Sequence, residues 1–309
     1  MSWDKLYENC KLCPRACGVN RLAGQVGFCG QTAELLIARA ALHMWEEPCI
    51  SGSAGSGAVF FNGCSLGCIY CQNYEISGTG MQALREDHGR NVTREHLVTL
   101  FLELQEQGAA NINLVTATQF LPHIVWAIPK AREAGLTIPI VYNTSGYETA
   151  AQLRQLTGLV DCYLPDFKYM NGDIARQYSK AADYPQQVKE ALAEMVGQTG
   201  PAVFDEKGML QKGVIVRHLV LPGQKEQAKE IIRYLHETYG DQIWLSILNQ
   251  YTPMPAVQGD PVLKRKLTTY EYEQVIAYAL ELGVEQAYRQ EGNAAAESFI
   301  PSFHGEGVE

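Results

Sequence analysis

The chain has 309 residues, a net charge of −9 at pH 7 and a sequence pI of about 5.4. Its acidic balance argues against a nucleic-acid partner bound on a basic face. No uninterrupted apolar run approaches the roughly 18 residues of a membrane span, and the N-terminus lacks the apolar core of a signal peptide. We therefore expect a cytoplasmic protein with no membrane or nucleic-acid partner.

The first 50 residues carry four clustered cysteines, Cys10, Cys13, Cys17 and Cys29. Thiols stay reduced in the cytosol, so these cysteines are expected to bind metal rather than to form disulfides. Four thiolates suffice for a zinc site or for a second iron–sulfur cluster, and the ligand type does not separate the two. Reduced cysteines without metal are the alternative. We expect residues 1–50 to form a small cysteine-rich appendage.

From residue 57 onward, short apolar runs alternate with segments of helical period. The apolar runs cover residues 57–61, 112–116, 138–143, 161–166, 213–221 and 243–248, with a weaker seventh at 285–290. Such near-continuous hydrophobicity is typical of parallel strands that are covered on both faces. Over residues 51–290 the pattern predicts an α/β fold, a partial or complete (β/α) barrel of TIM type with six units. A doubly wound open sheet is the alternative.

The helices between these runs have recognisable ends. Thr93 is expected to cap a helix that ends at Gly108. The next helix is expected over residues 123–135, with Pro129 as a kink or break. Three further helices are expected: one that stops at residue 197 or 200, one before residue 240, and one over residues 270–282.

Three cysteines follow the first predicted strand, in the stretch FFNGCSLGCIYCQNYEIS at 60–77. Cys64, Cys68 and Cys71 have the spacing C-x3-C-x2-C, and the aromatic Tyr70 precedes the last. Three thiolates can hold three corners of a 4Fe–4S cluster and leave the fourth iron open to a small molecule, whereas a structural site is closed. The spacing therefore predicts such a cluster. A zinc loop with a distant fourth ligand is the alternative.

This spacing resembles the signature of the radical S-adenosylmethionine superfamily, in which S-adenosylmethionine chelates the open iron. The resemblance implies reductive cleavage to a 5′-deoxyadenosyl radical, hydrogen abstraction from a substrate, and a reductant such as flavodoxin or ferredoxin. GCSLGCIYCQN (63–73) and LPDFKY (164–169) are similar to the pyruvate formate-lyase activating enzyme group. The resemblance is strongest to uncharacterised members with an N-terminal CxLCPRxCGV element, which is CKLCPRACGV (10–19) in this chain. The likeness spans residues 57–250 and implies a glycyl radical enzyme as candidate partner.

Polar residues at the ends of five predicted strands form the candidate site, because chemistry in such barrels lies at the carboxyl ends of the strands. The resemblance gives Asp166 and Lys168 the family's D-x-K contacts to the cofactor, an ordinary ion pair being the alternative. The resemblance also places Asn143 and Thr144 where the family has an Asp-Thr pair implicated in a cation site. Asparagine in place of aspartate removes a charge from that site.

A guanidinium suits a carboxylate, so Arg217 could pair with the methionyl carboxylate. His218 could contact ribose or substrate, and a core histidine is its alternative. The expected catalytic residues are Cys64, Cys68, Cys71, Lys168 and His218. The expected cofactor-binding residues are Tyr70, Asn73, Thr116, Thr118, Asn143, Ser145, Asp166, Lys168, Arg217, His218 and Gln250.

The sequence departs from the group after the second strand, where NLVTATQFLP (113–122) lacks the usual Gly-Gly-Glu motif. Thr116, Thr118 or Gln119 must then serve as neutral acceptors. The departure weakens the prediction of glycyl radical activation more than it weakens the prediction of a cluster. Radical modification of a small molecule or another protein is the first alternative; a non-catalytic iron–sulfur or zinc scaffold or electron carrier is the second.

Two lone cysteines and the tail complete the expectations. Cys49 and Cys162 are expected to pack as small hydrophobic side chains. The tail at 291–309 mixes aromatic residues with Gly and Pro. It could cover the barrel mouth or bind a partner, with disorder at the last residues as the alternative.

Overall fold

A computed structural model describes residues 5–78, 88–290, 301 and 303–308. Seven parallel strands form its centre, and they coincide with the seven predicted runs, the weaker seventh included. They are β2 (Ser56–Phe61), β4 (Ile112–Val115), β5 (Ile140–Thr144), β6 (Cys162–Pro165), β8 (Leu210–Leu219), β9 (Trp244–Leu248) and β10 (Ala287–Arg289).

The sheet is open. Its strand order is β10-β9-β8-β6-β5-β4-β2-β1-β3, and in the described part of the chain no pairing joins the two ends. Antiparallel strands complete it: β1 (Leu35–His43) and β3 (Arg90–Val92) at one edge, and β7 (Val203–Phe204) beside β8. The architecture is therefore a partial (β/α) barrel rather than a closed one.

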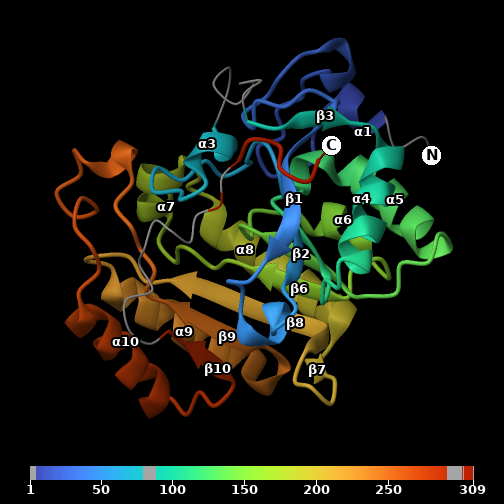
Figure 1. The fold of residues 1–309 in the computed structure, drawn as a ribbon. Helices are drawn as coiled ribbons and strands as arrows, with labels where there is room; N and C mark the ends of the chain where they lie inside the picture. Colours follow the sequence, from blue (N-terminus) through green and yellow to red (C-terminus); the bar gives the residue numbers. More distant parts are fainter. Residues whose placement is uncertain (1–4, 79–87, 291–300, 302, 309) are drawn as a thin grey trace.

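Helices cover the outside of the sheet (Figure 1). The longer ones are α4 (Arg94–Glu106), α5 (Leu121–Glu133), α7 (Gly172–Ser179), α8 (Tyr184–Thr199), α9 (Lys225–Tyr239) and α10 (Thr269–Glu281). The short ones are α1 (Lys5–Glu8), α2 (Pro48–Ser51), α3 (Tyr74–Ser77) and α6 (Ala150–Leu153). Single 3-10 turns lie at Arg21–Ala23, Thr118–Phe120, Arg154–Leu156, Gly240–Gln242 and Pro255–Val257.

The predicted helix ends are largely confirmed. The Thr93 side chain accepts a hydrogen bond from the His96 N–H and caps α4. Pro129 neither ends nor splits α5, which continues to Glu133. Every helix in the described residues is too short or too polar to cross a bilayer.

The barrel sheet begins earlier in the chain than expected. β1 pairs with β2 along its length, from Ile37 opposite Phe61 to His43 opposite Ser56. Residues 35–43 are thus part of the barrel, and the expected boundary at residue 50 falls inside it. The helix α2 follows β1. Its Cys49 and Ile50 pack with Cys162 and Leu210, near the amino ends of the parallel strands. Both lone cysteines are buried there, as predicted.

The described part of the tail lies along β1. The Gly305 N–H donates to the Ala38 carbonyl at 3.0 Å, and the Ala40 N–H donates to the Glu306 carbonyl at 3.0 Å. Phe303 is 1% exposed and packs against Phe60. This stretch is therefore packed against β1, and whether the tail covers the barrel mouth stays a prediction, because residues 291–300, 302 and 309 lie outside the described residues.

Candidate active site

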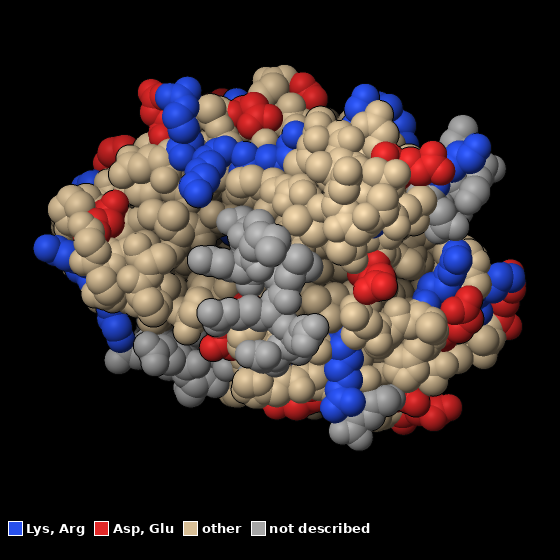
Figure 2. All heavy atoms as spheres, turned by 90° about the horizontal axis from the view of Figure 1, so that it is seen from above, with Lys and Arg blue, Asp and Glu red and all other residues tan. Residues whose placement is uncertain are grey.

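A cavity of about 240 Å³ lies where the parallel strands end, and it reaches inward to the segment between β1 and α2. Most of the expected site residues line it. They are Cys64, Cys68, Tyr70, Cys71, Asn73, Thr116, Asn143, Ser145, Asp166, Lys168, Arg217 and Gln250. On the molecular face seen from above, side chains of both charges are scattered among uncharged residues (Figure 2).

The three cysteines of the β2–α3 loop share one wall of the cavity. Burial raises the pKa of Cys64 to about 12, and repulsion from Cys68 and Cys71 adds to the shift, so the three sulfur atoms lie near one another. At neutral pH the Cys64 thiol therefore holds its proton and must release it to bind metal. The sulfur of Cys64 accepts a hydrogen bond from the Leu66 N–H at 3.3 Å.

The donor set fits a cluster held at three corners. All three thiols face one cavity, and that cavity also holds side chains able to bind a small molecule beside the metal. Across the described residues, no three His, Cys, Asp or Glu side chains converge in the way a single metal ion requires.

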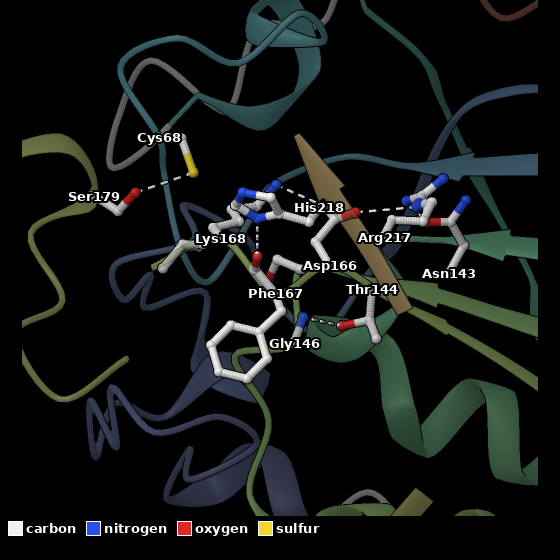
Figure 3. Close-up of polar contacts among 12 residues, drawn as sticks. Cys68, Asn143, Thr144, Gly146, Asp166, Phe167, Lys168, Ser179, Arg217 and His218 are labelled. Carbon is white, nitrogen blue, oxygen red and sulfur yellow. Dashed lines mark hydrogen bonds and ion pairs between the residues drawn. The ribbon is translucent and has the colours of Figure 1, made fainter. Parts of the chain in front are cut away.

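A network of charged side chains faces these cysteines from neighbouring strands (Figure 3). Arg217 on β8 lies beside Asp166 at the end of β6 through an isolated bridge. Its Nε donates to Asp166 Oδ1 at 3.0 Å, and its guanidinium also donates to Asn143 Oδ1 on β5. Lys168 Nζ donates to the other carboxylate oxygen of Asp166 at 2.7 Å. Parallel pairing of three strands thus brings these groups together.

Both members of the Asp166–Lys168 pair stay charged. Burial opposes ionisation of Asp166, but Lys168 and Arg217 hold its pKa below the usual value. Burial likewise opposes the charge on Lys168, but Asp166 and the nearby Cys68 hold its pKa above the usual value. Their side chains are 20% and 16% exposed. They are therefore part of the cavity wall, and not the exposed surface pair that was the alternative.

Glu46 is a site residue that the sequence did not reveal. It follows β1 and lines the cavity. Its carboxylate accepts hydrogen bonds from Arg217 Nη1 at 3.1 Å and from Asn143 Nδ2 at 3.2 Å. It therefore places next to Asn143 the negative charge that this residue lacks as an asparagine. The only sequence signal was an acidic pair, Glu46 and Glu47, just ahead of a short helix.

Two expected residues, Thr118 and His218, lie behind the cavity wall and do not line the cavity. Thr118 donates to Glu148 Oε1 at 2.6 Å, and Thr144 donates to the same buried oxygen. His218 is 4% exposed, and its Nδ1 lies 2.7 Å from the Phe167 carbonyl, to which only an N–H can donate. Burial lowers the pKa of His218 to about 4, so its ring is neutral. This is the position of a core histidine.

Of the three candidates for the missing Gly-Gly-Glu motif, Thr116 alone lines the cavity. Its φ of 59° is strained for a threonine, as backbone at binding sites often is. Gln119 is buried behind it. Its Nε2 donates to the Thr116 carbonyl at 2.7 Å and to the Asn62 carbonyl at 2.7 Å, which ties the end of β4 to the start of the cysteine loop.

The N-terminal segment packs directly against the cysteine loop. A Cβ on Gly63 would lie 2.6 Å from the Cys29 carbonyl oxygen, so only glycine fits there. Arg15 Nε donates to the Ser65 carbonyl at 2.9 Å. Burial raises the pKa of Cys13, and Cys29 and Cys10 add to the shift, which places these thiols near one another. Figure 1 shows this segment at the same end of the molecule as α3.

Known proteins resemble this chain in sequence. A model of the radical SAM superfamily matches residues 58–235. An uncharacterized protein of Methanocaldococcus jannaschii is 26% identical over 283 residues, covering 92% of this chain and 78% of its own.

Two solved structures share the fold. Streptococcus suis SuiB bound to precursor peptide SuiA aligns with a TM-score of 0.50 and 14% identity, over 75% of this chain and 47% of its own. The FeFe-hydrogenase maturase HydG of Carboxydothermus hydrogenoformans aligns with a TM-score of 0.50 and 14% identity, over 79% and 56%. The chain thus spans about half the length of these two proteins.

Proposed function

Because the chain belongs to the radical SAM superfamily, we propose that Cys64, Cys68 and Cys71 hold a 4Fe–4S cluster beside a bound S-adenosylmethionine. When bound, the two together supply a 5′-deoxyadenosyl radical that abstracts hydrogen from a substrate. The observation that carries this proposal is the cavity that joins three thiols to a set of partly buried charges at the strand ends.

The charged residues suit the polar groups of the cofactor. Arg217 has five N–H groups, and its bonds to Asp166, Glu46 and Asn143 engage three of them among the described residues. The remaining donors and the Lys168 ammonium can bind the methionyl carboxylate. Asp166 and Glu46 hold the two cations in place through ion pairs.

For the substrate we favour a polypeptide, as in glycyl radical activation. The support is the resemblance of residues 63–73 and 164–169 to the pyruvate formate-lyase activating enzyme group. The fold accommodates such a substrate, since SuiB, which shares it, was solved with a precursor peptide. A flavodoxin or ferredoxin would deliver the electron. The N-terminal cysteines remain a proposed second site for zinc or a cluster.

Production of 5′-deoxyadenosine tests the core of the proposal. Anaerobically reconstituted protein should form it from S-adenosylmethionine and dithionite. Cys71→Ala should abolish the product, whereas Cys162→Ala, which removes a buried thiol that does not line the cavity, should retain it. A wild-type protein that binds iron but forms no 5′-deoxyadenosine would favour the electron carrier instead.

A separate arm tests the partner. The active protein is mixed with candidate glycyl radical enzymes and examined by EPR. A glycyl signal that depends on Cys71 would support activation. Its absence with every candidate, alongside normal 5′-deoxyadenosine formation, would favour radical modification of another molecule.

A further inference from the structure

The second cysteine of the loop has a hydrogen-bond donor from a distant part of the chain. The Ser179 hydroxyl, at the last residue of α7, lies 3.0 Å from Cys68 Sγ (Figure 3). Ser179 is fully buried and Cys68 is partly exposed, so the donor side of this bond is shielded from water. The donor to Cys64 is a backbone N–H of the loop itself. Ser179 is therefore a side chain that substitution can remove without touching the loop.

A second hydroxyl fixes the direction of this bond. Tyr169 Oη lies 2.6 Å from Ser179 Oγ, and either oxygen could be the donor in this contact. A metal-bound Cys68 is a thiolate and can only accept. The single Ser179 proton then points to Cys68 Sγ, and Tyr169 must donate to Ser179. The two bonds form a chain that runs from Tyr169 through Ser179 to sulfur, and each bond polarises the next.

Hydrogen bonds to the backbone hold Ser179 next to the cysteine loop. Arg15 Nη2 donates to the Ser179 carbonyl at 2.8 Å, and Nε of the same guanidinium donates to the Ser65 carbonyl at 2.9 Å. On the other side, the Ile69 N–H donates to the Tyr178 carbonyl at 2.9 Å. Two independent cross-links thus fix the end of α7 against the residues on either side of Cys68.

We propose that Ser179 raises the reduction potential of the cluster held by Cys64, Cys68 and Cys71, an inference that rests on the proposed function. Reduction adds a negative charge to the cluster. A donor to a ligand sulfur stabilises the more negative state more strongly than the other, and such bonds tune iron–sulfur potentials. Ser179 is a positioning residue that acts through Cys68, and it widens the set of electron donors able to reduce the cluster.

The test is a redox titration followed by EPR on anaerobically reconstituted full-length protein. Wild type is compared with Ser179→Ala, Tyr169→Phe and Ser56→Ala. Ser56 is a matched control, since its hydroxyl is also fully buried but bonds Asn111 at the opposite end of β2. Iron and sulfide are quantified first, so that every potential refers to a loaded cluster.

For Ser179→Ala we expect about a tenfold higher ratio of oxidised to reduced cluster at a fixed potential, which is a fall in midpoint of about 59 mV for one electron. Tyr169→Phe should shift the midpoint less and in the same direction, and Ser56→Ala should leave it unchanged. A loaded Ser179→Ala protein with the wild-type midpoint overturns the inference alone. If Ser179→Ala does not load, Tyr169→Phe decides, and an unchanged midpoint overturns the inference. A wild-type protein that binds no cluster refutes the proposed function itself.

Discussion

Glu148 is expected to make the stability of the fold depend on pH. Its buried Oε1 accepts hydrogen bonds from Thr118 and Thr144, behind the cavity wall. Burial raises its pKa from 4.5 to about 7, although the two hydroxyls act in the opposite direction. The folded chain therefore keeps this proton to about pH 7, whereas the unfolded chain releases it near pH 4.5.

The sign and size of the effect follow from this difference. Between the two pKa values the folded state binds more protons than the unfolded state, so the free energy of unfolding falls as pH rises. Each tenfold difference in proton affinity is worth about 1.4 kcal/mol, which gives a total loss of about 3 kcal/mol by neutral to alkaline pH. Glu148→Gln keeps the accepting oxygen but cannot ionise. We expect it to match wild type at the acid end and to exceed it by about 3 kcal/mol at the alkaline end.

Urea unfolding of the reduced, cluster-free protein at a series of pH values between the two ends measures this difference. Glu133→Gln is the control, because Glu133 is an exposed residue of α5 paired with Lys130. Its stability should run parallel to wild type at every pH. If the Glu148→Gln profile also runs parallel to wild type, the burial argument for this carboxyl is refuted.

Three further predictions concern the cavity and the tail. Arg217→Met should lower the free energy of unfolding by about 2–4 kcal/mol, because it leaves the partly buried Glu46 carboxylate without its cation. Adding Glu46→Gln should recover part of the loss in urea unfolding, and a strictly additive double variant would contradict the network. Lys168→Met should weaken S-adenosylmethionine binding about tenfold or more in equilibrium dialysis, while unchanged affinity would remove Lys168 from the site. Phe303→Ala should detach the tail from β1 and speed hydrogen exchange of the Ala40 N–H, and unchanged exchange would show that the tail is held without its aromatic anchor.

The parallel strands and the cysteine loop could be predicted because their signals are local. Continuous apolar runs mark strands that are covered on both faces, and the cysteine spacing lies within one short stretch. β1 was missed because it pairs antiparallel and follows the cysteine-rich segment, so its residues were counted with the appendage. Glu46, which follows β1, was not predicted as a site residue for the same reason. Ser179 could not be found, since the hydrogen bond that distinguishes it spans 111 residues.

The alternation of side chains along a strand limits what can be predicted for His218. Arg217 and His218 are consecutive residues of β8, and consecutive side chains in a strand point to opposite faces. Only one of the two can face the cavity. Arg217 does, and His218 packs behind the wall against the Phe167 carbonyl. Which of the two faces inward depends on the register against β6, which only the structure supplies.

The central claim is that three cysteines hold a cluster whose remaining iron accepts S-adenosylmethionine. The most direct measurement is the EPR spectrum of the reduced, anaerobically reconstituted protein before and after addition of S-adenosylmethionine, with a Cys64→Ala, Cys68→Ala, Cys71→Ala triple variant to identify any signal from the N-terminal cysteines. We predict a 4Fe–4S spectrum that changes on addition and that the triple variant lacks. A spectrum indifferent to S-adenosylmethionine, or a protein that holds only zinc at these cysteines, would contradict the claim.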